Sequence, residues 1–161
     1  MKEELKNSSS FFSVFFLRLS NLLTMFFIFD KVVLEEIIMR SDIYVYEEDG
    51  ILIAKIKGEI DNSVTKNFRE VIDTNIIKNN IKYLIIDFED VNFVDSSGIG
   101  FIIGRYNLMK REKGFIVLSN INYYCEKIFK ISGILRLINS YTSLDEAKKE
   151  VLYNESYRIK I

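Results

Sequence analysis

The chain has 161 residues, a formal net charge of −1 and 48% hydrophobic residues, which is enough for one domain with a substantial core. This balance provides no basic surface for nucleic acid or an anionic membrane, and the single cysteine, Cys125, excludes an internal disulfide and fits a reducing cytosol. Histidine is absent, which removes the commonest general base, the commonest zinc ligand and every serine-histidine triad, so composition disfavours an enzyme.

The first 38 residues differ from the rest of the chain. Residues 11–29 are apolar apart from a few hydroxyls, Arg18 and Asn21, and are long enough for a membrane helix. However, Arg18 near the middle would cost about 2.5–3.5 kcal/mol on insertion scales, and the flanks show no positive bias. No small-residue cleavage site follows, which argues against a secretory signal peptide.

Three interpretations of this extension stay open: a membrane anchor, a soluble amphipathic segment, or a segment that is not translated. If Glu35-Glu36 has purine-rich codons, they would resemble a ribosome-binding sequence just upstream of Met39, where a regular pattern begins. We expect a mature N-terminus at or near Met39. The chain then divides into an extension at 1–38, a domain at 39–153 and a C-terminal tail at 154–161.

The domain begins with a predicted β-hairpin. Residues 43–46 and 51–56 are rich in β-forming residues and are separated by a polar tetrad that ends in Asp49-Gly50, which favours a tight turn. The turn Gly58-Glu59-Ile60-Asp61 ends the second strand, and Asp61, Asn62 or Ser63 can cap a helix. The predicted apolar face of that helix consists of Val64, Phe68, Val71, Ile72 and Ile76.

A strand-to-helix junction follows. Residues 83–88 are almost continuously apolar, as in a strand covered on both faces. In the stretch 91–100 an apolar run ends, Asp95 precedes the hydroxyls of Ser96 and Ser97, and a helical pattern begins. Because a helix N-terminus offers free N–H groups and a positive dipole end, a phosphate on either hydroxyl would find donors there.

The helix after this junction has two apolar sides. Five residues fall on one side at helical spacing and predict the face toward the sheet: Ile99, Ile102, Ile103, Tyr106 and Met109. Phe101 and Leu108 lie almost opposite, among Arg105 and Glu112. They are either incidental exposed hydrophobic residues or, together with Gly104, a surface for docking a partner.

The remaining elements complete an α/β pattern. Residues 115–118 predict a short strand, 122–131 a helix stopped by Ser132-Gly133, and 134–138 either an edge strand or a loop. Ser143 and Glu146 have capping-box spacing at the start of a final helix that extends to about residue 152. The order ββαβαβα(β)α indicates one α/β domain, a mixed sheet of four to five strands with helices packed against it.

Three short motifs resemble those of one protein family. The run Asp95-Ser96-Ser97-Gly98-Ile99-Gly100, preceded by Asn92-Phe93-Val94 and followed by Ile102-Ile103-Gly104-Arg105-Tyr106, resembles the phosphorylation loop of STAS-domain anti-sigma factor antagonists, most closely the stage II sporulation antagonists. The turns at 58–61 and 132–135 are similar to two further motifs of that family, in the right order on the right elements. The resemblance covers about residues 39–151.

The resemblance implies a cytoplasmic regulatory protein, not an enzyme, without cofactor or metal. In this family the unmodified antagonist binds an anti-sigma factor that is also a serine kinase, which frees the sigma factor for transcription, in some members during sporulation. The kinase phosphorylates a loop serine, the complex separates and a phosphatase restores the antagonist. By its place in the motif that serine is Ser97. The other implied loop and partner-binding residues are Asp61, Asp95, Ser96, Gly98, Ile99, Gly100, Phe101, Gly104 and Leu108.

Some alternatives remain beside this interpretation. The two serines could serve only as helix caps, and the domain could be a membrane-tethered or transporter-associated STAS regulator that is not a kinase substrate, particularly if residues 11–29 are translated and insert. We otherwise expect no membrane contact and a monomer between binding events. A dinucleotide site is disfavoured because the third glycine of the run 98–104 is displaced from the usual spacing. The acidic residues that could suggest magnesium are better explained as caps and loop charges: Asp61, Asp87, Glu89, Asp90 and Asp95.

Overall fold

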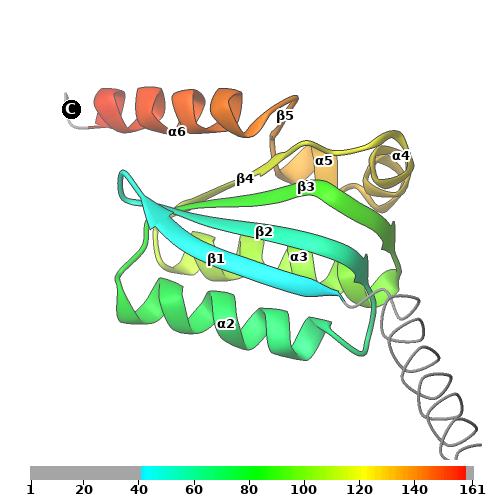
Figure 1. Ribbon diagram of the computed structural model, residues 1–161. Coiled ribbons are helices and arrows are strands. Elements are labelled where there is room, and N and C mark those ends of the chain that lie inside the picture. Colours follow the sequence, from blue (N-terminus) through cyan, green and yellow to red (C-terminus); the bar gives the residue numbers. More distant parts are fainter. Residues whose placement is uncertain (1–40, 159–161) are drawn as a thin grey trace, which may run out of the picture. The chain divides into compact units, whose positions relative to one another are not determined.

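The computed structural model of the chain describes residues 41–158 (Figure 1). The extension predicted at 1–38 and the start predicted at Met39 therefore lie outside the described residues. The elements are β1 (Asp42–Glu48), β2 (Ile51–Ile60), α2 (Thr65–Lys78), β3 (Tyr83–Val94), α3 (Ser96–Arg111), β4 (Phe115–Ser119), α4 (Tyr123–Ser132), α5 (Ile134–Leu137), β5 (Ser140–Tyr141) and α6 (Leu144–Arg158).

The five strands form one mixed sheet in the order β1-β2-β3-β4-β5, which confirms the predicted α/β class. Only β1 and β2 are antiparallel, and the other neighbours pair in parallel. Asp49 and Gly50 join the hairpin with φ angles of 52° and 75°. Two positive φ angles give the two-residue turn whose twist matches that of paired strands, so the aspartate-glycine signal predicted this turn correctly.

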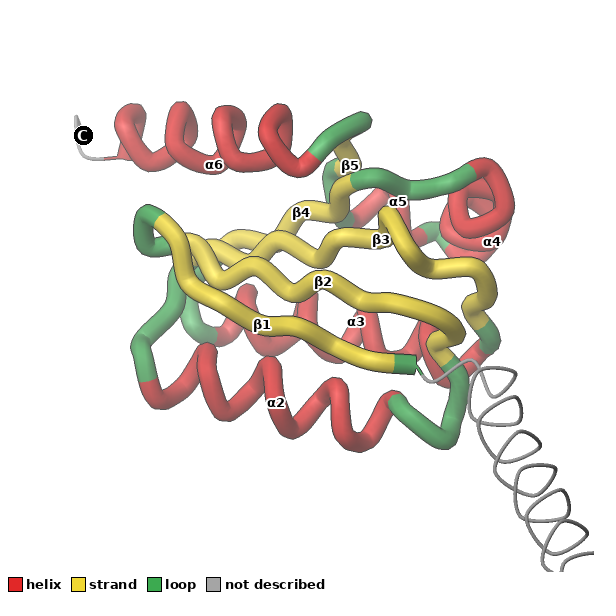
Figure 2. Tube along the Cα trace, in the orientation of Figure 1, coloured by secondary structure: helices red, strands yellow, loops and turns green. Residues whose placement is uncertain are grey.

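Helices cover both faces of the sheet, with α2 and α3 on one face and α6 on the other (Figures 1 and 2). The larger core lies beneath α2 and α3 and includes Phe68, Ile86, Phe88 and Phe101. A smaller core lies beneath α6, and its buried members are Ile51, Ile53, Ile85, Val117, Ala147 and Val151. Because the middle of β3 is buried on both sides, its apolar run is nearly continuous, as the sequence indicated.

The glycine stop of α4 and the serine at the start of α6 are confirmed, whereas α6 extends to Arg158, beyond the end predicted at about residue 152. Asn122 caps α4 by accepting a hydrogen bond from the Cys125 amide, and Gly133 ends α4 with a φ of 80°. At the start of α6 the Glu146 amide donates to Ser143 Oγ at 3.1 Å. These helix ends follow from short-range chemistry between residues a few positions apart.

Two predicted elements differ in the structure. Residues 134–138 form neither an edge strand nor a loop, because a helical turn, α5, follows Gly133 directly and buries Ile134 in the larger core. The predicted side-chain cap of α2 is also wrong, since the N-cap is Val64 and no side chain caps it. Asp61 instead accepts hydrogen bonds from the amide and hydroxyl of Ser63, which hold the preceding turn.

Cys125 lies in the larger core with no exposed surface. Burial raises the pKa of its thiol to about 11, against the lowering effect of a hydrogen bond with Asn122. The thiol is therefore neutral at physiological pH, and since the thiolate is the reactive form, Cys125 acts as a core residue.

Candidate functional site

The β3–α3 junction is built around the carboxylate of Asp95. Asp95 caps α3, and its Oδ1 accepts hydrogen bonds from the amides of Ser97 at 2.7 Å and Gly98 at 3.0 Å. The Asp95 amide donates to the Ile60 carbonyl at the end of β2, and the Asp95 carbonyl accepts from the Ile99 amide. The junction is thus fixed both to the neighbouring strand and to the first turn of its own helix.

The two serines do not cap the helix, so that alternative is wrong. Ser96 is exposed and Ser97 is half-buried, and neither hydroxyl forms a hydrogen bond within residues 41–158. The sequence suggested that the N–H groups at this helix N-terminus are free donors. In the structure the amides of Ser97 and Gly98 instead donate to Asp95. A phosphate on Ser97 would compete with that carboxylate for the same N–H groups.

Asp61 lies beside this junction. It directly follows Ile60, which pairs in register with Val94, so Asp61 and Asp95 leave neighbouring strand ends. Hydrogen bonds from Ser63 lower the pKa of Asp61, so its carboxylate is ionised at neutral pH. The structure thus places two of the predicted acidic residues at the same edge of the sheet.

Gly98 is required by close packing, and Gly100 is not. A Cβ on Gly98 would lie 2.6 Å from Val94 Cγ1 and 2.7 Å from the Ile60 carbonyl, whereas nothing lies within 4 Å of a Cβ on Gly100. We expect Gly98→Ala to lower the free energy of unfolding by about 1–3 kcal/mol, because backbone cannot yield easily to overpacking. Gly100→Ala, the matched control in the same helix, should raise it by up to about 1 kcal/mol. Urea unfolding measures both, and equal stabilities would contradict this packing argument.

The predicted docking pair on α3 is buried. Phe101 has no exposed surface and Leu108 is 6% exposed, while Ile99, Ile103 and Tyr106 are only half-buried. The helix packs against α2 as well as the sheet, so its buried face is wider than one stripe and is rotated from the predicted position. The prediction that Phe101 and Leu108 face a partner is therefore wrong. The α3 residues near Ser97 that reach solvent include Gly100, which is exposed, and Ile99, Ile103 and Gly104, which are half-buried.

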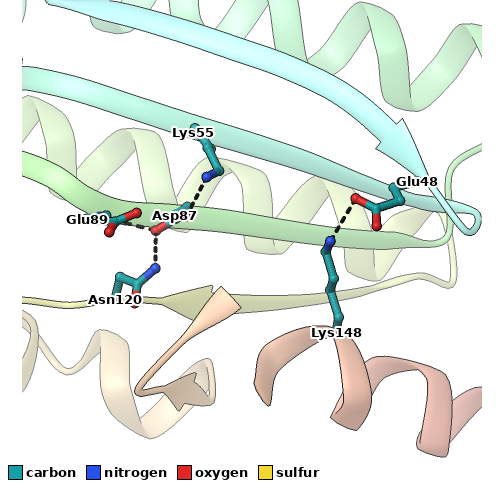
Figure 3. A network of polar contacts seen from close by, with 6 residues as sticks. All are labelled: Glu48, Lys55, Asp87, Glu89, Asn120 and Lys148. Atoms are coloured by element: carbon teal, nitrogen blue, oxygen red, sulfur yellow. Dashed lines mark hydrogen bonds and ion pairs between the residues drawn. The ribbon is translucent and has the colours of Figure 1, made fainter. Parts of the chain in front are cut away.

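A polar network lies on the α6 side of the sheet, toward the carboxyl ends of the parallel strands (Figure 3). Asp87, which is 1% exposed, accepts hydrogen bonds from Asn120 Nδ2 at 2.9 Å and the Glu89 amide at 3.1 Å, and its Oδ2 lies 3.8 Å from Lys55 Nζ. A second contact, from Lys148 Nζ to Glu48 at 2.7 Å, ties α6 to the hairpin. Across residues 41–158 no group of three acidic, histidine or cysteine side chains could hold a metal ion. The Asp87 contacts link β2, β3 and the β4–α4 connection to one another.

A cavity of about 400 Å³ lies at the opposite end of α3 from Ser97, where Met109, Lys110 and Phe115 contribute to its lining. It is not part of the junction that carries the serines. The sequence analysis did not indicate that the exposed rings of Phe93 and Tyr124 stack on each other beside the junction. Phe93 belongs to the quoted motif, but strand alternation gives no sign that its ring is turned outward.

Comparison with known proteins gives consistent matches. Residues 42–147 match the STAS domain. The chain is 26% identical over 113 residues to the anti-sigma F factor antagonist of Paenibacillus polymyxa, which covers 70% of this chain and 97% of that protein. The phosphorylated form of the Bacillus cell fate determinant SpoIIAA superimposes with a TM-score of 0.57 and 26% identity, over 68% of this chain and 99% of that one.

The fold is also found in a different setting. A sulfate transporter family protein from Wolinella succinogenes superimposes with a TM-score of 0.58 and 17% identity, over 68% of this chain and 88% of that one. The architecture alone is therefore shared by proteins of both kinds, and the residues at the β3–α3 junction have to carry any functional distinction.

Proposed function

Because the chain belongs to the STAS domain family, we propose that it is an anti-sigma factor antagonist switched by phosphorylation of Ser97. The unphosphorylated form binds an anti-sigma factor that is also a serine kinase, and this binding frees the sigma factor. The kinase transfers the γ-phosphoryl group of ATP to Ser97 Oγ, which loses its proton while ADP leaves. A phosphatase then hydrolyses the phosphoserine and restores the hydroxyl with release of inorganic phosphate.

The observation that carries this proposal is that Asp95, and neither serine, caps α3. Because Asp95 caps the helix, binding of the Ser97 hydroxyl by a kinase breaks no hydrogen bond of the folded domain. The loop around it is nonetheless held in place by the bond between the Asp95 amide and the Ile60 carbonyl. A preorganised loop with an unengaged hydroxyl is suited to phosphoryl transfer, since little ordering remains to be done on binding.

The same geometry explains how phosphorylation could end the binding. A phosphate brings about 1.5–2 negative charges to a position two residues from the Asp95 carboxylate. Since Asp95 already occupies the amides of Ser97 and Gly98, the two anions compete for the same donors. Phosphorylation therefore disturbs the Asp95 cap of α3. It also brings a charge to a kinase surface that fits a neutral hydroxyl. Both effects favour separation of the complex.

Variants at the two serines test the proposal. Ser97→Ala should bind the purified kinase like the wild type but persist in the complex when Mg-ATP is added, because it cannot be phosphorylated. Ser97→Asp should bind at least about tenfold more weakly, since a carboxylate imitates part of the phosphate charge. Ser96→Ala is the matched control and should keep phosphorylation and stability, within about 0.5 kcal/mol, because Ser96 caps nothing.

Mass spectrometry after incubation with kinase and ATP locates the phosphate, and calorimetry measures the affinities. Phosphate on Ser96 in the wild type, or on neither serine, would contradict the assignment of Ser97. A wild type that binds no anti-sigma factor kinase would contradict the proposed function as a whole.

The second candidate, a membrane-tethered or transporter-associated regulator, depends on residues 11–29, which lie outside the described residues. None of the helices in the described part of the chain is long and apolar enough to span a bilayer. Fractionation of the native protein together with sequencing of its N-terminus separates the two candidates, because only the tethered regulator requires the apolar segment in the membrane fraction.

A further inference from the structure

Three aromatic side chains reach solvent at the end of the domain that carries Ser97. Phe93 on β3 is 39% exposed and Tyr124 on α4 is 43% exposed, and their rings stack with centroids 6.2 Å apart and planes inclined by 23°. Tyr123 is 72% exposed, and Lys127 Nζ lies 4.3 Å from the centroid of its ring. We call Phe93, Tyr123 and Tyr124 the aromatic surface.

Irregular pairing of β3 turns Phe93 outward. Lys55 pairs with Asp87 but Lys57 with Asp90, and Gly58 pairs with Val91 but Glu59 with Phe93, so β3 carries an extra residue at two places. A strand without these bulges would place Phe93 on the same face as the buried Val91. The observed buried residues at the end of β3 are instead three positions apart, at Phe88, Val91 and Val94.

Hydrogen bonds fix this irregular segment to its neighbours. The Glu89 amide donates to Asp87 Oδ1 across the first bulge, and Asn120 Nδ2 donates to the same oxygen (Figure 3). Asn122, the cap of α4, donates from Nδ2 to the Val91 carbonyl at 2.5 Å. The start of α4, with Tyr123 and Tyr124, is thereby attached by hydrogen bonds to the part of β3 that carries Phe93.

The aromatic surface lies within reach of any partner that contacts Ser97. Phe93 is four residues from Ser97, so their Cα atoms are at most about 14 Å apart. A standard protein interface covers about 800 Å² on each partner, which corresponds to a circle of about 16 Å radius. An interface centred on Ser97 is therefore large enough to include Phe93, and the ring stacked on it, Tyr124, continues the same surface.

On this basis we propose that the aromatic surface is the anchor by which the anti-sigma factor kinase holds this chain, an inference that rests on the proposed function. Exposed, rigid rings lose little conformational entropy on binding and bury a large apolar area, which is why aromatic residues dominate interface energetics. The partner must then offer an apolar recess for the Phe93 and Tyr124 rings beside its active site. The surface takes the role that the sequence analysis gave to Phe101 and Leu108.

The test compares exposed aromatic residues near to and far from Ser97. Phe93→Ser and Tyr124→Ser should each raise the Kd for the purified anti-sigma factor kinase of the same organism at least tenfold. Tyr46→Ser is the matched control, because Tyr46 is also 39% exposed but pairs with Ile53, which pairs with Ile85, nine residues or about 30 Å before Val94 along β3. Its Kd should change less than twofold. Phe93→Tyr keeps the ring and should keep the affinity within threefold.

Two controls separate docking from folding and from function. Thermal unfolding of each variant reports whether the fold survives, and hydrogen exchange of the unaltered complex should show protection of the amides at residues 122–127 on binding. A kinase that binds the wild type, Phe93→Ser and Tyr124→Ser equally, or a complex without that protection, overturns the anchor while leaving the proposed function intact. A wild type that neither binds nor is phosphorylated overturns the proposed function and the anchor together.

Discussion

Phe101→Ala is expected to lower the free energy of unfolding by about 3–5 kcal/mol, the usual cost of removing a fully buried phenylalanine side chain. The Phe101 ring has no exposed surface and meets Phe68 of α2 edge to face, with centroids 6.3 Å apart. The Arg105 Cζ atom lies 5.4 Å from the same ring centroid. Removing the ring would leave a cavity between α2, α3 and the sheet, so the loss includes packing as well as hydrophobic transfer.

Phe93→Ala is the matched control, because it truncates the same residue type at an exposed position. Its cost should stay within about 1 kcal/mol, and urea unfolding measures both variants. Similar stabilities for the two alanine variants would mean that Phe101 faces solvent, as the sequence pattern indicated. For the same reason Phe101→Asp should prevent folding and is unsuitable as a probe of binding.

Asp73→Ala is expected to cost about 3–5 kcal/mol, because it leaves a buried guanidinium without its counter-charge. Arg105 on α3 is 4% exposed, and it contacts Asp73 on α2 through an ion pair from Nε to Oδ1 at 2.8 Å and a hydrogen bond from Nη2 to Oδ2 at 2.9 Å. Burial raises the pKa of Asp73 and lowers the pKa of Arg105, each against the attraction of its partner. Both groups thus give up hydration to form the pair, and the more deeply buried Arg105 is the one that depends on its partner.

Two further variants separate the pair from its surroundings. Arg105→Met should cost only about 1–3 kcal/mol, since the Asp73 side chain is 28% exposed and can reach water. The double variant Asp73→Leu with Arg105→Met should recover much of the loss, because apolar replacement of a buried pair is often neutral. Chemical denaturation gives the free energy of unfolding of the wild type and the three variants, so that the single and double replacements can be compared. A small effect of Asp73→Ala would show that the guanidinium finds water or another acceptor.

The elements that the sequence predicted correctly depend on neighbours within a few residues. Asp49-Gly50 specified its turn because both positions need positive φ angles. Gly133 specified the end of α4 because it adopts the left-handed conformation there. Such signals are complete within one short stretch, so they do not depend on what packs against it.

The predictions of side-chain burial were wrong where contacts with residues distant in the sequence determine which side of an element is buried. Phe101 and Arg105 occupy their buried positions because of Phe68 and Asp73 on α2, each about 30 residues earlier in the chain. A helical periodicity identifies one apolar stripe, but α3 has two neighbours, so its buried face is wider than that stripe. The outward turn of Phe93 likewise depends on how β3 pairs with β2, which strand alternation does not contain.

The candidate loop was predicted in its position but not in its internal roles. The sequence placed Asp95, Ser96 and Ser97 at a helix start, where each of the three residue types is a competent cap. Only the backbone conformation distinguishes them, and it makes Asp95 the cap and Ser97 its hydrogen-bond donor. That assignment also shows that the site offers fewer free donors to a phosphate than the sequence suggested.

The order of the strands bears on how this domain is assembled during synthesis. The strands lie across the sheet in the same sequence in which they occur in the chain. As the chain emerges from the ribosome, the β1–β2 hairpin can close first, and each later strand then adds to the free side of the strand before it, after its crossover helix has formed. No strand has to insert between two that are already paired. Assembly can therefore keep pace with translation, with the Ser97 loop taking shape once β3 has docked on β2 and α3 has begun to form.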